Sequence, residues 1–229
     1  MSKIILAIET SGQACSAALF TEKAQFVRYE LTDRAHTQLL LPMVQDLIEE
    51  ASVPLEAIQA IAVGRGPGSF TGVRIAVSAA QGMAYGLNIP VYPISTLAAL
   101  CYQVEPEKGC LVIPAIDARM HEVYTTSYGV VETQFQQITE ECLLSPAELL
   151  QHLVQAPSSK IMAIGSGWDA YYEEITANTA HSIVRLENRQ VNALQIGLIA
   201  KAQIEKSIQG VDALNVLPVY IRDKVAEKS

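Results

Sequence analysis

The fold is indicated most strongly by residues 64–75, Gly-Arg-Gly-Pro-Gly-Ser-Phe-Thr-Gly-Val-Arg-Ile. An apolar run at 60–64 precedes this stretch, and an apolar, alanine-rich segment at about 72–87 follows it, which predicts a strand, a tight turn and a helix. A helix N-terminus after such a turn exposes N–H groups that suit an anion. No Gly-Lys-Ser/Thr follows, and the spacing is not GxGxxG, so neither a P-loop nor a dinucleotide fingerprint is indicated.

Two interpretations of this turn remain. It is either a structural turn, whose glycines supply unusual backbone angles and close packing, or a loop that binds an anion or a nucleotide. The candidate residues of such a loop are Gly66, Gly68, Ser69, Thr71 and Gly72.

The segments around the turn predict an ordered series of elements in the first half of the chain. Short turns separate three strand-like runs, as in an antiparallel meander, and helical and strand patterns follow. The expected strands are 3–10, 14–20, 25–30 and 60–64, and the expected helices are 36–51 and 72–87.

A similar order restarts after residue 110. A second glycine turn, 165–167, follows the fourth strand of this half, and Ser145, Pro146 and Glu148 form a helix-capping pattern. The expected strands are 111–117, 122–128, 131–138 and 160–164, and the expected helices are 145–154 and 192–206. The pattern βββαβα therefore occurs twice, which predicts an α/β protein with two subdomains at 1–103 and 104–210. The remaining tail, 211–229, is expected to pack back on the N-terminal half.

Composition narrows the class of protein. The chain has 229 residues, of which 50% are hydrophobic and 17% charged, enough to form a full core. Its net charge of −8 and the lack of a Lys/Arg cluster argue against a large nucleic-acid surface. The four cysteines form no CxxC pair and are expected to be reduced thiols. No apolar run reaches membrane-span length, and the N-terminus is expected to be a strand rather than a signal peptide, so a cytoplasmic location is expected.

Four motifs together resemble one family over essentially the whole chain. They are IETS at 8–11, GPGSFTGVRI at 66–75, the pair IDAR and EVY at 116–124, and PVYIR at 218–222. GPGSFTGVRI is the most specific of them. The sequence resembles the TsaB (YeaZ) family, a non-catalytic paralogue of TsaD in the bacterial synthesis of tRNA threonylcarbamoyladenosine (t6A). The resemblance implies a duplicated actin-like fold (ASKHA, ribonuclease-H-like).

The resemblance also implies partners. A TsaB-like protein pairs with a TsaD-like catalytic paralogue, and a TsaE-like ATPase joins that pair. It forms a homodimer when alone, and it meets tRNA only within the complex. No cofactor of its own is expected, although ATP or ADP is expected to bind at an interface of the complex.

The loops that hold phosphate in working members of the superfamily look degenerate here. The first reads Glu-Thr-Ser-Gly from Glu9 and Thr10 onward, and the second reads Asp-Ala-Arg-Met from Asp117 through Arg119. The second loop lacks glycine, so a backbone phosphate cradle would be crowded. The HxxxH metal pair of the catalytic paralogue has no counterpart at 95–100, and no metal site is expected.

Two helices carry more apolar surface than a single sheet can cover. Apolar residues span about 200° of helix 36–51, and helix 72–87 leaves only a narrow polar sector. Helix 72–87 is either buried wholly inside its own domain or forms a protein–protein surface, and the second interpretation is preferred. The resemblance also implies a protein–protein surface, because TsaB-like proteins contact their partner through these helices. The predicted contact residues are Leu39, Leu40, Met43, Leu47, Val73, Arg74, Val77, Ala80, Gln81, Met83 and Tyr85.

Two other functions remain open. A free-standing ATP-dependent enzyme of the actin-like superfamily would use Glu9 or Asp117 together with the glycine turns. An independent tRNA-binding module is disfavoured by the acidic charge and by the lack of a basic, aromatic stripe.

Overall fold

The computed structural model describes residues 3–32, 34–153, 160–177, 179, 181–187 and 189–222. The chain forms two compact units, each with its own sheet. The first unit contains residues 1–99 and 191–219, and the second contains residues 100–190 and 220–229.

The first unit is built on a five-stranded sheet with the order β3-β2-β1-β4-β5. The first three strands are antiparallel neighbours, whereas β1, β4 and β5 run parallel. Their bounds are β1 Ile5–Glu9, β2 Ala14–Phe20, β3 Gln25–Leu31, β4 Ala60–Gly64 and β5 Val91–Ile94.

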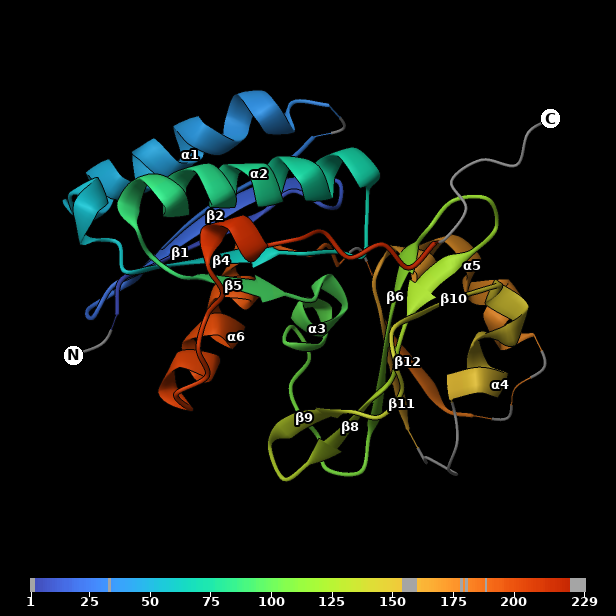
Figure 1. Ribbon diagram of the computed structural model, residues 1–229. Helices are drawn as coiled ribbons and strands as arrows, with labels where there is room; N and C mark the ends of the chain where they lie inside the picture. Colours follow the sequence, from blue (N-terminus) through green and yellow to red (C-terminus); the bar gives the residue numbers. More distant parts are fainter. Residues whose placement is uncertain are drawn as a thin grey trace. The chain divides into compact units, whose positions relative to one another are not determined.

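Helices cover both faces of this sheet (Figure 1). Two long helices, α1 (His36–Ala51) and α2 (Phe70–Leu87), lie on one face, and α6 (Ala193–Glu205) lies on the other. The two-residue period of a strand explains the division. Leu19 of β2 packs in the core beneath α1 and α2, whereas its neighbour Phe20 lies against Gly197 of α6. The unit also includes the short elements η1 (Leu55–Ala57), η3 (Ala213–Asn215) and most of α3 (Thr96–Cys101).

The boundaries of α2 follow from its capping residues. The Ser69 hydroxyl oxygen accepts a hydrogen bond from the Gly72 N–H at 3.3 Å, so the helix begins at Phe70, slightly before the predicted start. It ends where Asn88 adopts a left-handed conformation, with φ of 54°.

The second unit repeats the strand plan of the first. Its main sheet path is β10-β7-β6-β11-β12, which corresponds strand for strand to β3-β2-β1-β4-β5. The predicted duplication into an α/β protein with two subdomains is therefore confirmed. The strands are β6 Leu111–Asp117, β7 Val123–Thr125, β8 Tyr128–Val131, β9 Gln134–Gln137, β10 Cys142–Leu144, β11 Ile161–Ile164 and β12 Ile183–Leu186, and the helices are η2 Pro146–Glu148, α4 Leu149–Leu153 and α5 Ser166–Thr176.

The structure differs from the predicted strands at 122–138. The chain leaves the β7 ladder at Thr126 and Ser127, which are buried and hydrogen-bonded to Thr139. A β8–β9 hairpin and the separate strand β10 follow, in place of one strand at 131–138. The predicted helix 145–154 forms as the short η2 and α4, with the expected capping box between Ser145 and Glu148.

The predicted subdomain boundary at 104–210 also needs correction. Helix α6 forms where predicted, but it packs on the first sheet, and α5 is the helix that follows β11. The Ser16 hydroxyl oxygen of β2 accepts a hydrogen bond from the Ala193 N–H at 2.9 Å, which fixes the start of α6 against the first unit. Among the described residues, no helix is long and apolar enough to cross a membrane.

Candidate functional site

Most of the predicted partner-contact residues lie in the core of the first unit. Six of them are at most 7% exposed and pack between the helices and the sheet. A helical wheel identifies an apolar arc, but it does not show which part of the arc the sheet takes. The following members of the predicted set form part of the unit's own core: Leu40, Met43, Leu47, Val73, Val77 and Ala80.

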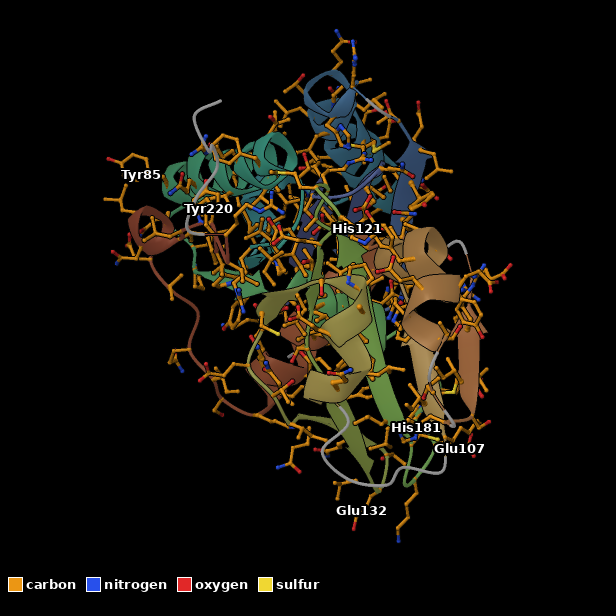
Figure 2. The ribbon with its side chains drawn as sticks, turned by 90° about the vertical axis from the view of Figure 1, so that its right-hand side faces the viewer. Tyr85, Glu107, His121, Glu132, His181 and Tyr220 are labelled. Carbon is orange, nitrogen blue, oxygen red and sulfur yellow. The ribbon has the colours of Figure 1, made fainter. Side chains whose placement is uncertain are left out.

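Four other predicted contact residues retain exposed surface. Arg74 and Tyr85 are exposed on α2, and Tyr85 points outward at the end of that helix (Figure 2). Leu39 and Met83 are half-buried at the edge of the core. The exposed part of the predicted surface is therefore narrower than the apolar arcs of the two helices.

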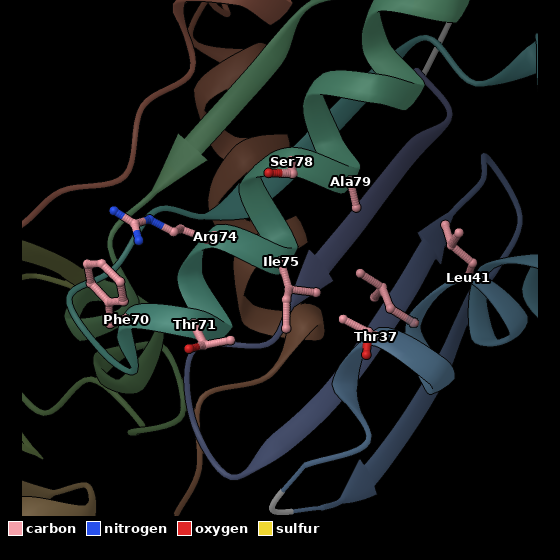
Figure 3. Close-up of a pocket in the computed structure, with 9 residues that line it drawn as sticks. Thr37, Leu41, Phe70, Thr71, Arg74, Ile75, Ser78 and Ala79 are labelled. Carbon is pink, nitrogen blue, oxygen red and sulfur yellow. The ribbon is translucent and has the colours of Figure 1, made fainter.

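An open groove of about 500 Å³ lies between α1 and α2 (Figure 3). Leu41 is 57% exposed at its α1 side, although it is a large apolar residue. The buried residues of α1, at positions 36, 40, 43, 44 and 47, lie on the side of the helix that packs on the sheet. Positions 37 and 41 therefore lie on the adjacent face. That offset is the sequence signal that could have located the groove. The lining residues are Thr37, Leu40, Leu41, Phe70, Thr71, Arg74, Ile75, Ser78 and Ala79.

A cation–π contact gives one end of the groove a positive rim. The Arg74 guanidinium carbon lies 3.5 Å from the centroid of the Phe70 ring. The contact arises because the two residues are four positions apart on α2, one helical turn. The aromatic ring remains 47% exposed.

Further along α2, two glycines leave room for a neighbouring backbone. A Cβ atom built on Gly82 or Gly86 would have no neighbour within 4 Å. Small residues on an exposed helix face permit a second helix to approach closely.

The C-terminal segment closes one side of the first unit. Val211 pairs with Val91 through two backbone hydrogen bonds of 2.8 and 2.9 Å. The Gln81 Nε2 donates to the Val216 carbonyl oxygen at 2.9 Å. Residues 211–219 therefore pack on the N-terminal half, and Gln81, predicted as a partner contact, binds this segment. The rest of the predicted tail does not follow the expectation: residues 220–222 group with the second unit, and 223–229 lie outside the described residues.

The glycine turn at 64–72 is closed by hydrogen bonds within the chain. The Ser69 N–H donates to the Ser11 carbonyl oxygen at 2.7 Å, and the Thr10 hydroxyl donates to the Gly72 carbonyl oxygen at 2.7 Å. A Cβ on Gly68 would lie 2.7 Å from the same Ser11 oxygen. The turn is thus packed directly on the 9–12 loop, which favours the structural interpretation over an anion site. Gly66 adopts φ of +95°, and Thr71 lies on the exposed side, where it lines the groove.

Glu9, the strand-end acid of the first degenerate loop, is fully buried. Its Oε1 accepts a hydrogen bond from the Ser11 N–H, while Oε2 has no hydrogen-bond partner among the described residues. A Cβ on Gly64 would lie 1.6 Å from Oε2, so only glycine leaves space for this carboxyl group. Burial raises the pKa of Glu9 from 4.5 to about 7, and the Ser11 hydrogen bonds offset part of that rise. The two carboxyl oxygens of Glu9 therefore lie against Ser11 of its own loop and against Gly64 at the end of β4.

This burial predicts a pH-dependent stability. Because the folded pKa lies above the unfolded one, the protonated form is favoured on folding. The resulting stabilisation is complete below pH 4.5 and is lost as the pH rises through 7. At about 1.4 kcal/mol per pKa unit, the loss amounts to roughly 3 kcal/mol. We expect urea unfolding from pH 4.5 to 8 to show a smaller decline for Glu9→Gln than for the wild type. Parallel curves would contradict a raised Glu9 pKa.

The second degenerate loop is stabilised by local contacts in the second unit. Asp117 Oδ1 accepts the Arg119 N–H at 2.9 Å and the Tyr171 hydroxyl at 3.3 Å. The Asp117 N–H donates to the Ser166 hydroxyl oxygen at 3.1 Å. The Arg119 side chain is 82% exposed and lies 3.5 Å from Asp117 Oδ2. Glu9 belongs to the first unit, whereas Asp117 and Arg119 belong to the second.

The remaining groups of chemical interest are possible metal ligands and the cysteine thiols. Among the side chains that the structure describes, no cluster of three or more His, Cys, Asp or Glu residues could hold a metal ion. All four cysteines are free thiols, and burial raises the pKa of Cys15 to about 11. A thiol in such surroundings stays protonated and is a poor nucleophile.

Comparisons with known proteins agree with this architecture. A family model described as TsaD, tRNA N6-adenosine threonylcarbamoyltransferase, matches residues 22–229. The chain is 37% identical to the "tRNA threonylcarbamoyladenosine biosynthesis protein TsaB" of Escherichia coli K12, covering 98% of this chain and 96% of that protein. It is 34% identical to the TsaB protein of Haemophilus influenzae, covering 98% and 95%.

Solved structures show the same likeness. The structure of YeaZ from Pseudomonas aeruginosa aligns with a TM-score of 0.83 at 37% identity, covering 95% of this chain and 99% of that one. A second P. aeruginosa structure, described as an uncharacterized protein with similarity to peptidase YeaZ, aligns with a TM-score of 0.85 at 38% identity, covering 96% and 100%. With relatives matched over nearly their whole length and the duplicated fold in common, the chain belongs to the TsaB (YeaZ) family.

Proposed function

We propose that this chain is a non-catalytic subunit of the machinery that makes tRNA threonylcarbamoyladenosine. In this role it pairs with a TsaD-like catalytic paralogue and recruits a TsaE-like ATPase. The observation that supports this proposal most strongly is the open, largely apolar groove between α1 and α2. It is formed by the side chains of these helices that the sheet does not cover. The names of the relatives supply the pathway.

The groove suits a helical partner. It exposes Leu41 and Phe70 as anchors, and it has small side chains at Ser78 and Ala79 along its α2 wall. Beyond the groove, α2 continues to Gly82, where the absence of a side chain lets a partner helix approach closely. An apolar helix laid along this surface would complete a bundle with α1 and α2, and two copies of the chain could pair in the same way when the paralogue is absent.

The loops support a role without chemistry of its own. The glycine turn uses its backbone groups to pack on the 9–12 loop, and the Glu9 carboxyl faces Gly64 and Ser11. A free-standing ATP-dependent enzyme would need these groups to face its substrate. Nucleotide, in this proposal, binds where the chain meets a partner, and tRNA is held by other subunits because this chain is acidic.

A size and stoichiometry measurement tests the proposal. The purified chain is run on size-exclusion chromatography with light scattering, alone and mixed with the TsaD-like paralogue from the same cell. We expect a monomer or homodimer for the chain alone and a 1:1 heterodimer in the mixture. When the TsaE-like ATPase and ATP are also supplied, we expect the ATPase to join this heterodimer. Failure to form any complex, combined with ATP hydrolysis by the lone chain that Glu9→Gln or Asp117→Ala removes, would establish the enzymatic alternative instead.

A further inference from the structure

The hairpin loop between β6 and β7 has an unusual backbone. Arg119, Met120 and His121 have φ angles of 62°, 55° and 60°, so three consecutive residues are left-handed. Arg119 and Met120 are not among glycine, asparagine, aspartate and histidine, the residues that adopt this conformation most readily. Such a run is strained and persists only where its surroundings impose it.

The surroundings include a side chain from the far end of the chain. One terminal nitrogen of Arg222, Nη2, donates to the carbonyl oxygens of Ala118 and Arg119 at 3.1 and 3.4 Å, and to Glu122 Oε2 at 2.5 Å. The other, Nη1, lies 2.9 Å from Met120 Sδ. The Arg222 side chain is only 15% exposed. The Arg222 guanidinium therefore binds the carbonyl groups of Ala118 and Arg119 and the carboxylate of Glu122, the last residue of the loop.

The remaining support comes from the loop itself and from α5. The Ala118 N–H donates to the Glu122 carbonyl oxygen at 2.9 Å, and the Glu122 N–H donates to the Arg119 carbonyl oxygen at 3.2 Å. His121 Nε2 lies 3.1 Å from Glu174 Oε1 of α5. These contacts close the loop, but only the guanidinium bonds the carbonyl groups from outside it, within the residues described.

We propose that Arg222 is a releasable clip that keeps the 118–122 loop in its left-handed form. With the clip closed, the loop displays Arg119 and Met120, which are 82% and 74% exposed. With the clip open, the strained residues relax to ordinary backbone angles and the display is lost. The two states couple the C-terminal segment to the loop, so a molecule that binds either one shifts the other. This inference does not depend on the groove or on the proposed pairing.

Hydrogen exchange of the full chain tests the clip. Exchange of the amides of Ala118, Arg119 and Glu122 is followed by mass spectrometry for the wild type and for Arg222→Gln. We expect exchange at these amides to become at least tenfold faster in the variant, with the sheet amides of β6 unchanged. Arg28→Gln is the matched control, because Arg28 makes a 2.5 Å ion pair with Glu50 in the first unit. Unchanged loop exchange in Arg222→Gln would overturn the proposal.

A second variant tests the strain even if Arg222→Gln fails to fold. Glycine carries no penalty at positive φ, so Arg119→Gly is expected to raise the melting temperature while keeping the loop's backbone hydrogen bonds. In the double variant with Arg222→Gln, it is expected to reverse most of the acceleration in exchange. The control Lys23→Gly, at an exposed turn position outside the positive-φ residues, is expected to leave the melting temperature unchanged or lower. A lower melting temperature for Arg119→Gly would show that no strain is stored there.

Discussion

Gly72→Ala is expected to destabilise the first unit by about 3 kcal/mol, the upper end of the usual cost of overpacking. A Cβ at this position would lie 2.1 Å from the Thr10 carbonyl oxygen and 3.1 Å from the Ser11 Cα atom. Both are main-chain atoms, so neither can rotate away as a side chain would. Accommodation requires α2 to move off the 9–12 loop, which also breaks the hydrogen bond from the Thr10 hydroxyl to the Gly72 carbonyl oxygen.

Gly82→Ala, ten positions further along the same helix, is the matched control. Its Cβ would meet nothing within 4 Å, so the higher helix propensity of alanine should stabilise the free chain by up to about 1 kcal/mol. Urea unfolding followed by circular dichroism measures both variants. We expect Gly72→Ala to lower the free energy of unfolding and Gly82→Ala to raise it, although both replace a glycine of α2 by alanine. Equal stabilisation by both would mean that α2 does not pack on the 9–12 loop as described.

The duplicated fold was predictable because its signals are local. The strand before Gly64, the glycine turn and the alanine-rich helix each have a clear period or turn residue, and the second half repeats their order. The strand pairing of the two units, β3-β2-β1-β4-β5 and β10-β7-β6-β11-β12, follows from that repeated order.

The location of α6 could not be predicted in the same way. Its apolar residues indicate a helix, but nothing in their spacing shows which of two similar sheets they cover. The deciding contacts join residues far apart in the sequence, Ser16 to Ala193 and Phe20 to Gly197. The left-handed loop at 119–121 was missed for a related reason, because its conformation depends on Arg222, about a hundred residues away.

The sequence indicated that both helices have surplus apolar surface, but not which of their residues stay exposed. Both helices do carry apolar side chains on two sides, as their wide arcs indicated. The sheet takes the longer stripe, including Leu40, Leu47 and Ala80, and leaves Leu41 and Phe70 exposed. Ala80→Arg would therefore test folding, whereas Leu41→Glu tests the surface.

Leu41→Glu is expected to weaken pairing with the TsaD-like paralogue at least 100-fold and to leave this chain folded. The side chain is already 57% exposed in the free chain, so the melting temperature should change by no more than about 2 °C. In the complex, a partner helix in the groove would bury the new carboxylate among apolar groups, and a buried charge without a partner is costly. Isothermal titration of the paralogue into each variant measures the difference.

Leu31→Glu separates the groove from general effects of surface charge. Leu31 is 63% exposed on the edge strand β3, outside the groove, so the same substitution there should leave the affinity within about twofold of wild type. Ser78→Arg adds an independent test, because it fills the groove from the α2 wall without removing an apolar contact from the core. If Leu31→Glu weakened pairing and both groove variants did not, the contact surface would lie on the β3 edge. Loss of pairing in the two groove variants alone would instead show that α1 and α2, having given one face to their own sheet, use the remaining face to hold the partner.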